Sequence, residues 1–126
     1  MTDDTSGGGG GEGDGVGTID GTVLDRLFAT IAARRGADPA TSYTAKLFSR
    51  GTEKIAQKLG EEAVEAVIAA VEAKPEGLVA ESADLLYHLL VAWADAGLAP
   101  ADIWRELERR TAQSGIAEKQ SRPNKS

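Results

Sequence analysis

The sequence predicts an all-α fold, a bundle of about four to five helices. Apolar residues recur at helical spacing in several segments, and glycine or proline separates one segment from the next. No segment alternates apolar and polar residues as a half-buried strand does. About 90 residues of helix form a thin core. We therefore expect a homodimer in which two copies share and complete the bundle.

The first two expected helices are short. One begins at Thr22 and ends before Gly36, because glycine commonly follows the last turn of a helix. The other covers residues 43–49. Ser42 can cap its first turn by accepting a backbone hydrogen bond, and Gly51 stops it.

Two long helices and a final shorter one follow. Thr52 is expected to cap a helix that runs to about Ala73. Pro75 fits the first turn of the next helix, which continues to Asp95 or the residue after it. Pro100 opens the last helix in the same way. The expected buried face of that helix consists of Ile103, Trp104 and Leu107.

Both ends of the chain lack apolar periodicity. We expect a flexible, acidic, Gly-rich tail over residues 1–20, an all-α domain over residues 21–113 and a second tail over residues 114–126. The first twenty residues hold five of the twenty acids and no base, so fifteen acids face fourteen bases in the rest. Such a nearly neutral body lacks the basic stripe of a nucleic-acid-binding protein.

The sequence also argues against membrane insertion and disulfide bonding. Its longest apolar stretch, residues 85–94, is too short to span a bilayer, and no secretory signal is visible. The absence of cysteine excludes disulfides and thiolate ligands. We expect a cytoplasmic protein.

Two clusters of acids carry the strongest chemical signal. Glu61, Glu62 and Glu65 share one helix face, and Glu81 and Asp84 share a face of the next helix. A hairpin between the helices would bring both clusters together, where like charges repel unless a cation lies between them. Oxygen ligands from carboxylates suit a hard cation such as Mg²⁺. The pattern predicts a magnesium site.

Ordinary solvated surface acids are the alternative. Apolar residues flank the acidic arc of the first long helix, and residues 78–93 are apolar almost all round. A helix of that kind is expected to be buried, and buried acids need a cation or another partner. The metal site is therefore the favoured interpretation.

Four short runs of sequence allow a comparison with known families. Residues 42–47 read Ser-Tyr-Thr-Ala-Lys-Leu, and residues 60–65 read Gly-Glu-Glu-Ala-Val-Glu. Residues 81–89 read Glu-Ser-Ala-Asp-Leu-Leu-Tyr-His-Leu, and residues 114–122 read Ser-Gly-Ile-Ala-Glu-Lys-Gln-Ser-Arg. These runs resemble the motifs of the phosphoribosyl-ATP pyrophosphohydrolase family, within the MazG-type all-α nucleoside-triphosphate pyrophosphohydrolases. The resemblance covers roughly residues 23–122.

This resemblance implies a reaction. Members hydrolyse N1-(5-phosphoribosyl)-ATP to N1-(5-phosphoribosyl)-AMP and pyrophosphate, the second step of histidine biosynthesis. Mg²⁺ suits such a reaction because it neutralises phosphate charge and acidifies the attacking water. A housekeeping nucleoside-triphosphate pyrophosphohydrolase of the same superfamily is one alternative. A non-catalytic helical dimerisation module is another.

Within this interpretation the acids take different roles. Glu61 is a candidate for the base that activates water or for a ligand of a second ion, and Glu62 is expected to act in catalysis as well as in metal binding. The alternative for Glu61 is a surface acid paired with Lys58 or Lys54. The expected metal ligands are Glu62, Glu65, Glu81 and Asp84.

Three lysines and one histidine complete the expected site. Lys46, Lys54 and Lys58 are candidates for binding the phosphates, although plain surface lysines or charge compensation within a helix would produce the same pattern. His88 lies four residues after Asp84 on the same face. We expect it to hold Asp84 in position without binding the metal itself. The alternative is a hydrogen-bonded histidine of the core.

Overall fold

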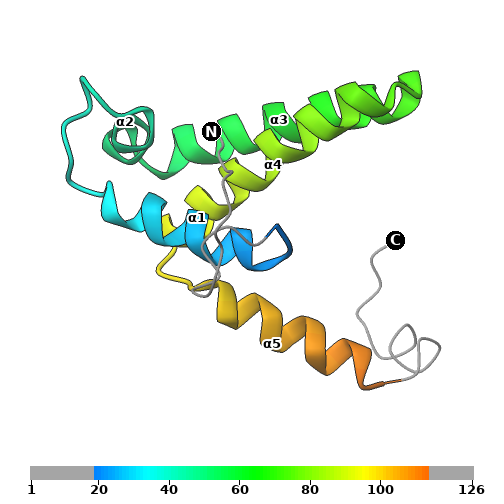
Figure 1. Ribbon diagram of the computed structural model, residues 1–126. Coiled ribbons are helices and arrows are strands. Elements are labelled where there is room, and N and C mark those ends of the chain that lie inside the picture. The colour runs from blue at the N-terminus through cyan, green and yellow to red at the C-terminus, as the bar shows by residue number, and fades with distance from the viewer. Residues whose placement is uncertain (1–18, 114–126) are drawn as a thin grey trace.

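The computed structural model describes residues 19–113, which form five α-helices and no strand (Figure 1). The all-α prediction is confirmed. Residues 1–18 and 114–126, which make up most of the two expected tails, lie outside the described residues. The helices are α1 (Thr22–Ala33), α2 (Tyr43–Arg50), α3 (Thr52–Glu72), α4 (Pro75–Asp95) and α5 (Pro100–Thr111).

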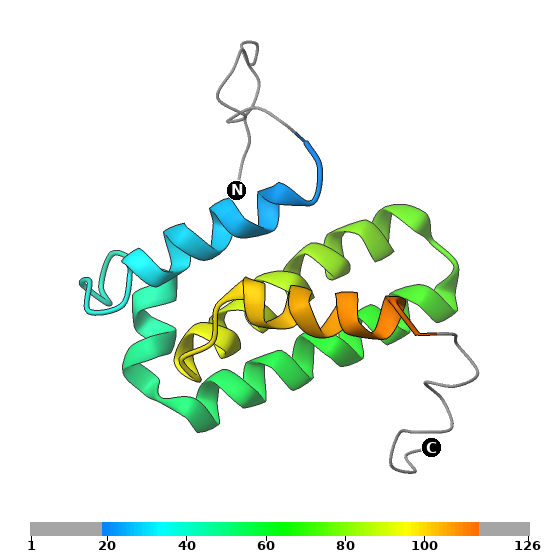
Figure 2. The same ribbon diagram turned by 90° about the horizontal axis from the view of Figure 1, so that it is seen from below.

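The two longest helices, α3 and α4, form an antiparallel hairpin to which the other helices attach. Helix α1 packs against α4, and α2 packs against both hairpin helices near the start of α3. Helix α5 contacts α1 (Figure 2). The hairpin extends beyond α1 and α2, so its far end has no covering helix in the described chain (Figure 1).

The hydrophobic core lies where α1, α2, the first turns of α3 and the last turns of α4 meet. Burying an aliphatic side chain contributes about 1.5–3 kcal/mol relative to leaving it exposed. The core therefore holds the short helices against the base of the hairpin. Its buried members are Ile31, Leu47, Ile55, Leu90 and Val91.

Of the two predicted helix caps, one is observed and the other is not. Ser42 caps α2 as predicted, because its hydroxyl oxygen accepts a hydrogen bond from the Ala45 N–H at 3.1 Å. The prediction that Thr52 caps α3 is wrong. Gly51, with φ of 92°, both ends α2 and precedes α3, so Thr52 is already helical. The Thr52 hydroxyl instead donates to the Asp95 carboxylate at 2.7 Å, which ties the start of α3 to the end of α4.

The turn between α3 and α4 sets how the two helices align. Ala73 adopts a left-handed conformation with φ of 58°, and Pro75 occupies the first turn of α4 as predicted. The chain therefore reverses within two residues. Residues equally far from Ala73 in sequence lie beside each other on the two helices.

Helix α5 attaches mainly through Trp104. The Trp104 ring meets the Trp93 ring edge to face, with centroids 6.0 Å apart, and its indole N–H donates to the Asp25 carboxylate at 3.3 Å. Ile103 and Trp104 are half-buried as expected, but Leu107 is 52% exposed. The predicted burial of Leu107 is wrong because α5 diverges from the other helices toward its C-terminal end (Figure 1).

The same helix supplies a test of stability against pH. Hydrogen bonds from Arg109 and Arg110 lower the pKa of Glu106 to about 2 from the ordinary 4.5. A lowered folded-state pKa gives stability that is present above about pH 4.5 and is lost as the pH falls toward about 2. Glu106→Gln should therefore lower the melting temperature by a small, constant amount above about pH 5, and the difference should vanish near pH 2.

The control is Glu108→Gln, which removes the same charge from the same helix. The measurement is the melting temperature of both variants and the wild type from about pH 2 to pH 7. A difference between Glu106→Gln and the wild type that persists unchanged at the acid end would contradict the account.

Candidate metal centre and phosphate pocket

The alignment of the hairpin brings the acids of α3 and α4 together. Glu62 and Asp84 each lie eleven residues from Ala73, and Glu65 and Glu81 each lie eight residues from it. Each of these two acids of α3 therefore has an acid of α4 at the same position along the hairpin axis. The tight turn between α3 and α4 thus places the two acidic motifs beside each other, and together they form one acidic patch.

Three of these acids form a compact group. Glu62, Glu81 and Asp84 each offer a carboxylate oxygen within 4.8 Å of the others. Mg²⁺ binds oxygens at about 2.0–2.1 Å in octahedral geometry, so its ligand oxygens are about 3 Å apart when adjacent and about 4 Å apart when opposite. Small side-chain rotations would bring the three oxygens to such spacings. The donor set is oxygen only, which suits Mg²⁺.

Electrostatic repulsion within the patch also favours a cation. Burial raises the pKa of Glu81, and the negative charges of Glu65, Asp84 and Glu62 raise it further. None of the four acids forms an ion pair with another described residue. Glu65 lies outside the compact group, although its charge is the largest electrostatic influence on Glu81. A bound divalent ion would relieve this repulsion.

The expected burial of the acids is only partly observed. Glu62 and Glu81 are half-buried, whereas Glu65 and Asp84 are exposed. The expectation is wrong for these last two because each hairpin helix has one side open to solvent in the single chain. The apolar character of α4 also continues onto that open side, where Val79 is 70% exposed.

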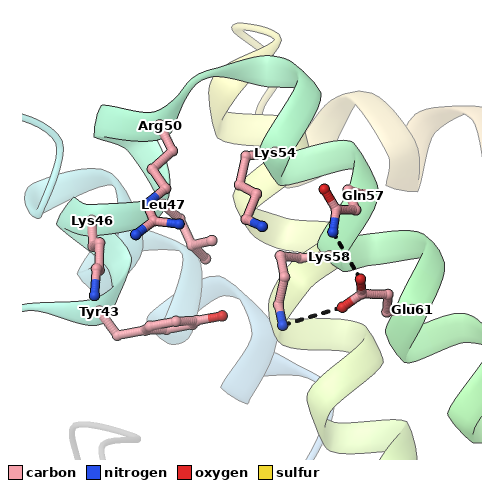
Figure 3. A pocket seen from close by; sticks show the side chains of 8 residues that line it. All are labelled: Tyr43, Lys46, Leu47, Arg50, Lys54, Gln57, Lys58 and Glu61. Atoms are coloured by element: carbon pink, nitrogen blue, oxygen red, sulfur yellow. Dashed lines mark hydrogen bonds and ion pairs between the residues drawn. The ribbon is translucent and has the colours of Figure 1, made fainter.

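Glu61 lies outside the compact acid group. It pairs with Lys58 at 3.3 Å and accepts a hydrogen bond from Gln57 at 2.9 Å (Figure 3). The hydrogen bonds from Gln57 and Lys58 lower the pKa of Glu61, which makes it a weaker base. The bond to Glu61 also raises the pKa of Lys58. These are the contacts expected if Glu61 is an acid paired with Lys58.

His88 is buried and contacts Asp84 through the backbone. Its Nδ1 lies 2.8 Å from the Asp84 carbonyl oxygen, and its Nε2 lies 3.3 Å from the Tyr43 hydroxyl. A carbonyl only accepts, so Nδ1 donates, and in the neutral ring Nε2 accepts from Tyr43. His88 thus links the α4 turn that carries Asp84 to α2. It does not contact the Asp84 carboxylate by these bonds.

A second contact joins α2 and α4 beside His88. The hydroxyls of Thr44 and Tyr87 are hydrogen-bonded, and the Tyr87 ring meets the His88 ring edge to face at 4.9 Å. Burial raises the pKa of the Tyr87 hydroxyl, so it stays protonated. The arrangement holds α2 in a fixed position against α4.

A basic pocket of about 250 Å³ lies between α2 and α3 (Figure 3). It brings together Lys46, Lys54 and Lys58, the three lysines singled out from the sequence. It also includes Arg50, which the sequence reasoning missed. Arg50 lies four residues after Lys46, so both occupy one face of α2, and that spacing could have revealed it. The other lining residues are Tyr43, Leu47, Gln57 and Glu61.

Comparison with known families decides the classification. Residues 24–111 match the model of the family described as phosphoribosyl-ATP pyrophosphohydrolase. This chain belongs to the phosphoribosyl-ATP pyrophosphohydrolase family. The match covers nearly all of the five helices, and it includes both the acid group and the basic pocket.

Individual members of the phosphoribosyl-ATP pyrophosphohydrolase family are similar over most of their length. A phosphoribosyl-ATP pyrophosphatase of Azospirillum brasilense is 65% identical over 104 residues, which is 82% of this chain and 94% of the relative. The protein of the same name from Paramagnetospirillum magneticum is 60% identical over 106 residues, or 84% and 97% of the two chains. The Rhodospirillum rubrum protein is 61% identical over 100 residues, or 79% and 86%.

The family assignment confirms the resemblance drawn from the sequence motifs. Within residues 19–113 of this phosphoribosyl-ATP pyrophosphohydrolase family member, no helix is both long and apolar enough to cross a membrane.

Proposed function

We propose that this chain hydrolyses N1-(5-phosphoribosyl)-ATP to N1-(5-phosphoribosyl)-AMP and pyrophosphate with the aid of Mg²⁺, the second step of histidine biosynthesis. Family membership and the names of highly identical relatives support this activity. The observation that carries the proposal for this site is the position of the basic pocket directly beside the acid group. Lys58 belongs to the pocket, and the charge of Glu62 acts on it.

Each group has a role in this reaction. Glu62, Glu81 and Asp84 would hold Mg²⁺, which when bound supplies Lewis-acid charge and an acidified water. Glu65 would extend the acid patch and could help to hold a second ion or the attacking water. Lys58 neutralises charge on the phosphate nearest the patch.

Glu61 and His88 have positioning roles in the proposal. Glu61 holds the Lys58 ammonium in place through the ion pair between them. We therefore favour this role over that of a base, because a carboxylate with a lowered pKa accepts a proton poorly. His88 fixes the α4 turn at Asp84 through the Asp84 carbonyl.

A substrate panel tests this function. With Mg²⁺ present, kcat/KM for phosphoribosyl-ATP should exceed kcat/KM for ATP and the common deoxynucleoside triphosphates by on the order of 100-fold, because a site built for a polar group rejects ligands that lack it. Comparable values for the ordinary triphosphates would favour a housekeeping pyrophosphohydrolase. Absence of pyrophosphate release from every nucleotide would favour a non-catalytic helical module.

We further propose that the chain works as a homodimer, with the open face of the hairpin as the interface. Seven large apolar side chains on α3 and α4 are 37–79% exposed, which is unusual for a monomer surface. Residues 66–71 of α3 contain no charged residue, as expected of a helix packed on several sides. The exposed residues are Val64, Val67, Ile68, Val71, Leu78, Val79 and Leu86.

The dimer can be disrupted by one buried charge. Val67→Asp should convert the protein to monomer at micromolar concentration, because an unpaired charge in an apolar interface is costly to desolvate. The control is Val23→Asp, which places the same charge on a 47% exposed valine of α1. Multi-angle light scattering measures the mass of both variants. A wild-type monomer, or a Val67→Asp protein that remains as dimeric as the control, would contradict the proposed interface.

A cytoplasmic location is also part of the proposal. It is supported by the names of the relatives, because phosphoribosyl-ATP is a nucleotide derivative whose phosphate charges keep it from crossing an apolar bilayer unaided. Cell fractionation followed by an activity assay tests it, and activity confined to the membrane or extracellular fraction would contradict it.

A further inference from the structure

The basic pocket between α2 and α3 carries more positive charge than the acids around it neutralise. Among the described residues, Lys46, Arg50 and Lys54 form no ion pair. Glu61 is the only acid that lines the pocket, and Lys58 and Gln57 already bond to its carboxylate. Three cations from two helices therefore surround one space whose only lining acid is already paired with Lys58.

The side chains are placed so that one anion could contact several of them. Arg50 reaches into the space from α2, and Lys54 reaches into it from the facing side of α3 (Figure 3). Arginine presents a planar fork of N–H donors that matches two oxygens of a phosphate at once. The volume, about 250 Å³, is below the roughly 300–1,000 Å³ typical of pockets for a whole ligand. The pocket therefore suits one part of a substrate.

The pocket extends away from the acid group along α3. Lys58 lies four residues before Glu62, about 6 Å along the helix axis, and Lys54 lies eight residues before it, about 12 Å away. Lys58 can thus reach a phosphate at the metal centre. Arg50 faces Lys54 across the pocket from α2, so an anion held between them is separate from one held at the acids (Figure 3).

The substrate of the proposed reaction carries two separate phosphate groups. Its triphosphate hangs from the ribose on N9 of the purine, and its monophosphate hangs from the second ribose on N1, across the ring. The triphosphate belongs at the metal centre, where the anhydride is cleaved. The remaining anion is the monophosphate, which an ordinary nucleoside triphosphate lacks.

We propose that Lys46, Arg50 and Lys54 bind the 5-phosphate of the phosphoribosyl group and so select phosphoribosyl-ATP over ordinary nucleoside triphosphates. This assignment rests on the proposed function, because it takes the substrate from there. Arg50 is the central contact. The pocket is then a specificity site, separate from the acid group at which the phosphoanhydride is cleaved.

The first test compares two substrates that differ by this phosphate alone, phosphoribosyl-ATP and N1-ribosyl-ATP. In Arg50→Ala, the ratio of kcat/KM for the first to kcat/KM for the second should fall about tenfold to 100-fold, as expected for loss of a charge-assisted hydrogen-bond pair. The ratio for Arg50→Lys should fall between the ratios for Arg50→Ala and the wild type, because lysine keeps the positive charge but lacks the two-pronged guanidinium. The matched control is Arg105→Ala, an exposed arginine of α5 outside the pocket, which should leave the ratio unchanged.

An unchanged ratio in Arg50→Ala would overturn the assignment, whether both rates fall together or neither falls. Equal losses would place the pocket cations on the triphosphate. Circular dichroism of each variant verifies that it is folded, and Lys46→Ala repeats the measurement with a different side chain of the same pocket.

A second test does not depend on hydrolysis. Wild-type protein in Mg²⁺-free buffer should bind ribose 5-phosphate in a calorimetric or NMR titration, and it should not bind ribose. Arg50→Ala should weaken that binding at least about tenfold. If phosphoribosyl-ATP is not hydrolysed at all, the proposed function fails, and this titration still decides whether the pocket takes a sugar phosphate. Binding of ribose 5-phosphate that Arg50→Ala leaves unchanged would overturn the site itself.

Discussion

Replacing Glu62, Glu81 or Asp84 singly with alanine should lower the rate of pyrophosphate release by on the order of 100–1,000-fold, as removal of a direct stabilising group does in other enzymes. The carboxylate oxygens of these three residues come within 4.8 Å of one another, so each deletion would remove one of the three proposed ligands of the same ion. Glu65→Ala should cost less, about tenfold to 100-fold, because its carboxylate lies outside this group.

These losses should occur without unfolding. Each acid repels the others in the absence of metal, as the raised pKa of Glu81 indicates, so its removal should leave the metal-free protein at least as stable as the wild type. The measurement combines initial rates at saturating Mg²⁺ with melting curves in EDTA. The control is Glu76→Ala, which removes an exposed acid of α4 outside the group. If two of the three variants keep near-wild-type rates, the assignment of the ligands is wrong.

Chelation should abolish activity, Mg²⁺ should restore it, and Ca²⁺ should bind without supporting turnover. Both ions accept carboxylate oxygens, so the acid group should take either one. Mg²⁺ requires a tight octahedral shell at about 2.0–2.1 Å and retains waters, whereas Ca²⁺ takes more ligands at about 2.3–2.6 Å. The charge of Ca²⁺ is spread over a larger radius, so its bound water stays less acidic and a weaker source of the nucleophile.

A paired measurement separates binding from turnover. Thermal shift reports binding of each ion, since a ligand that binds only the folded state raises the melting temperature. Pyrophosphate release reports turnover. Asp84→Ala serves as the control, because its thermal shift with either ion should be reduced. Equal rates with Ca²⁺ and Mg²⁺, or full activity in EDTA, would mean that the carboxylates do not hold a catalytic Mg²⁺.

The architecture that builds this site was accessible from local sequence features. Helical spacing and the breakers Gly51 and Pro75 were sufficient to place the helices within about two residues of their observed ends. The three- and four-residue spacing of the acids, together with one tight turn, was sufficient to expect the two acidic faces to meet. Both features act over short sequence distances, where the geometry of a helix leaves little choice.

Features that depend on tertiary arrangement were less accessible. Thr52 has the chemistry of a cap, yet Gly51 already makes the junction and Asp95, 43 residues away, takes the threonine hydroxyl. The exposure of Leu107 follows from the direction in which α5 leaves the bundle, which no local pattern encodes. Arg50 joins the basic pocket only because α2 packs across the start of α3.

The most direct test of the proposed function is to identify the products from phosphoribosyl-ATP. The wild-type protein is incubated with this substrate and Mg²⁺, and the mixture is resolved by phosphorus NMR and mass spectrometry, with Glu62→Ala as the inactive control. We predict phosphoribosyl-AMP and pyrophosphate in equal amounts, with no orthophosphate. Formation of phosphoribosyl-ADP and orthophosphate, or recovery of intact substrate with the wild type, would contradict the account.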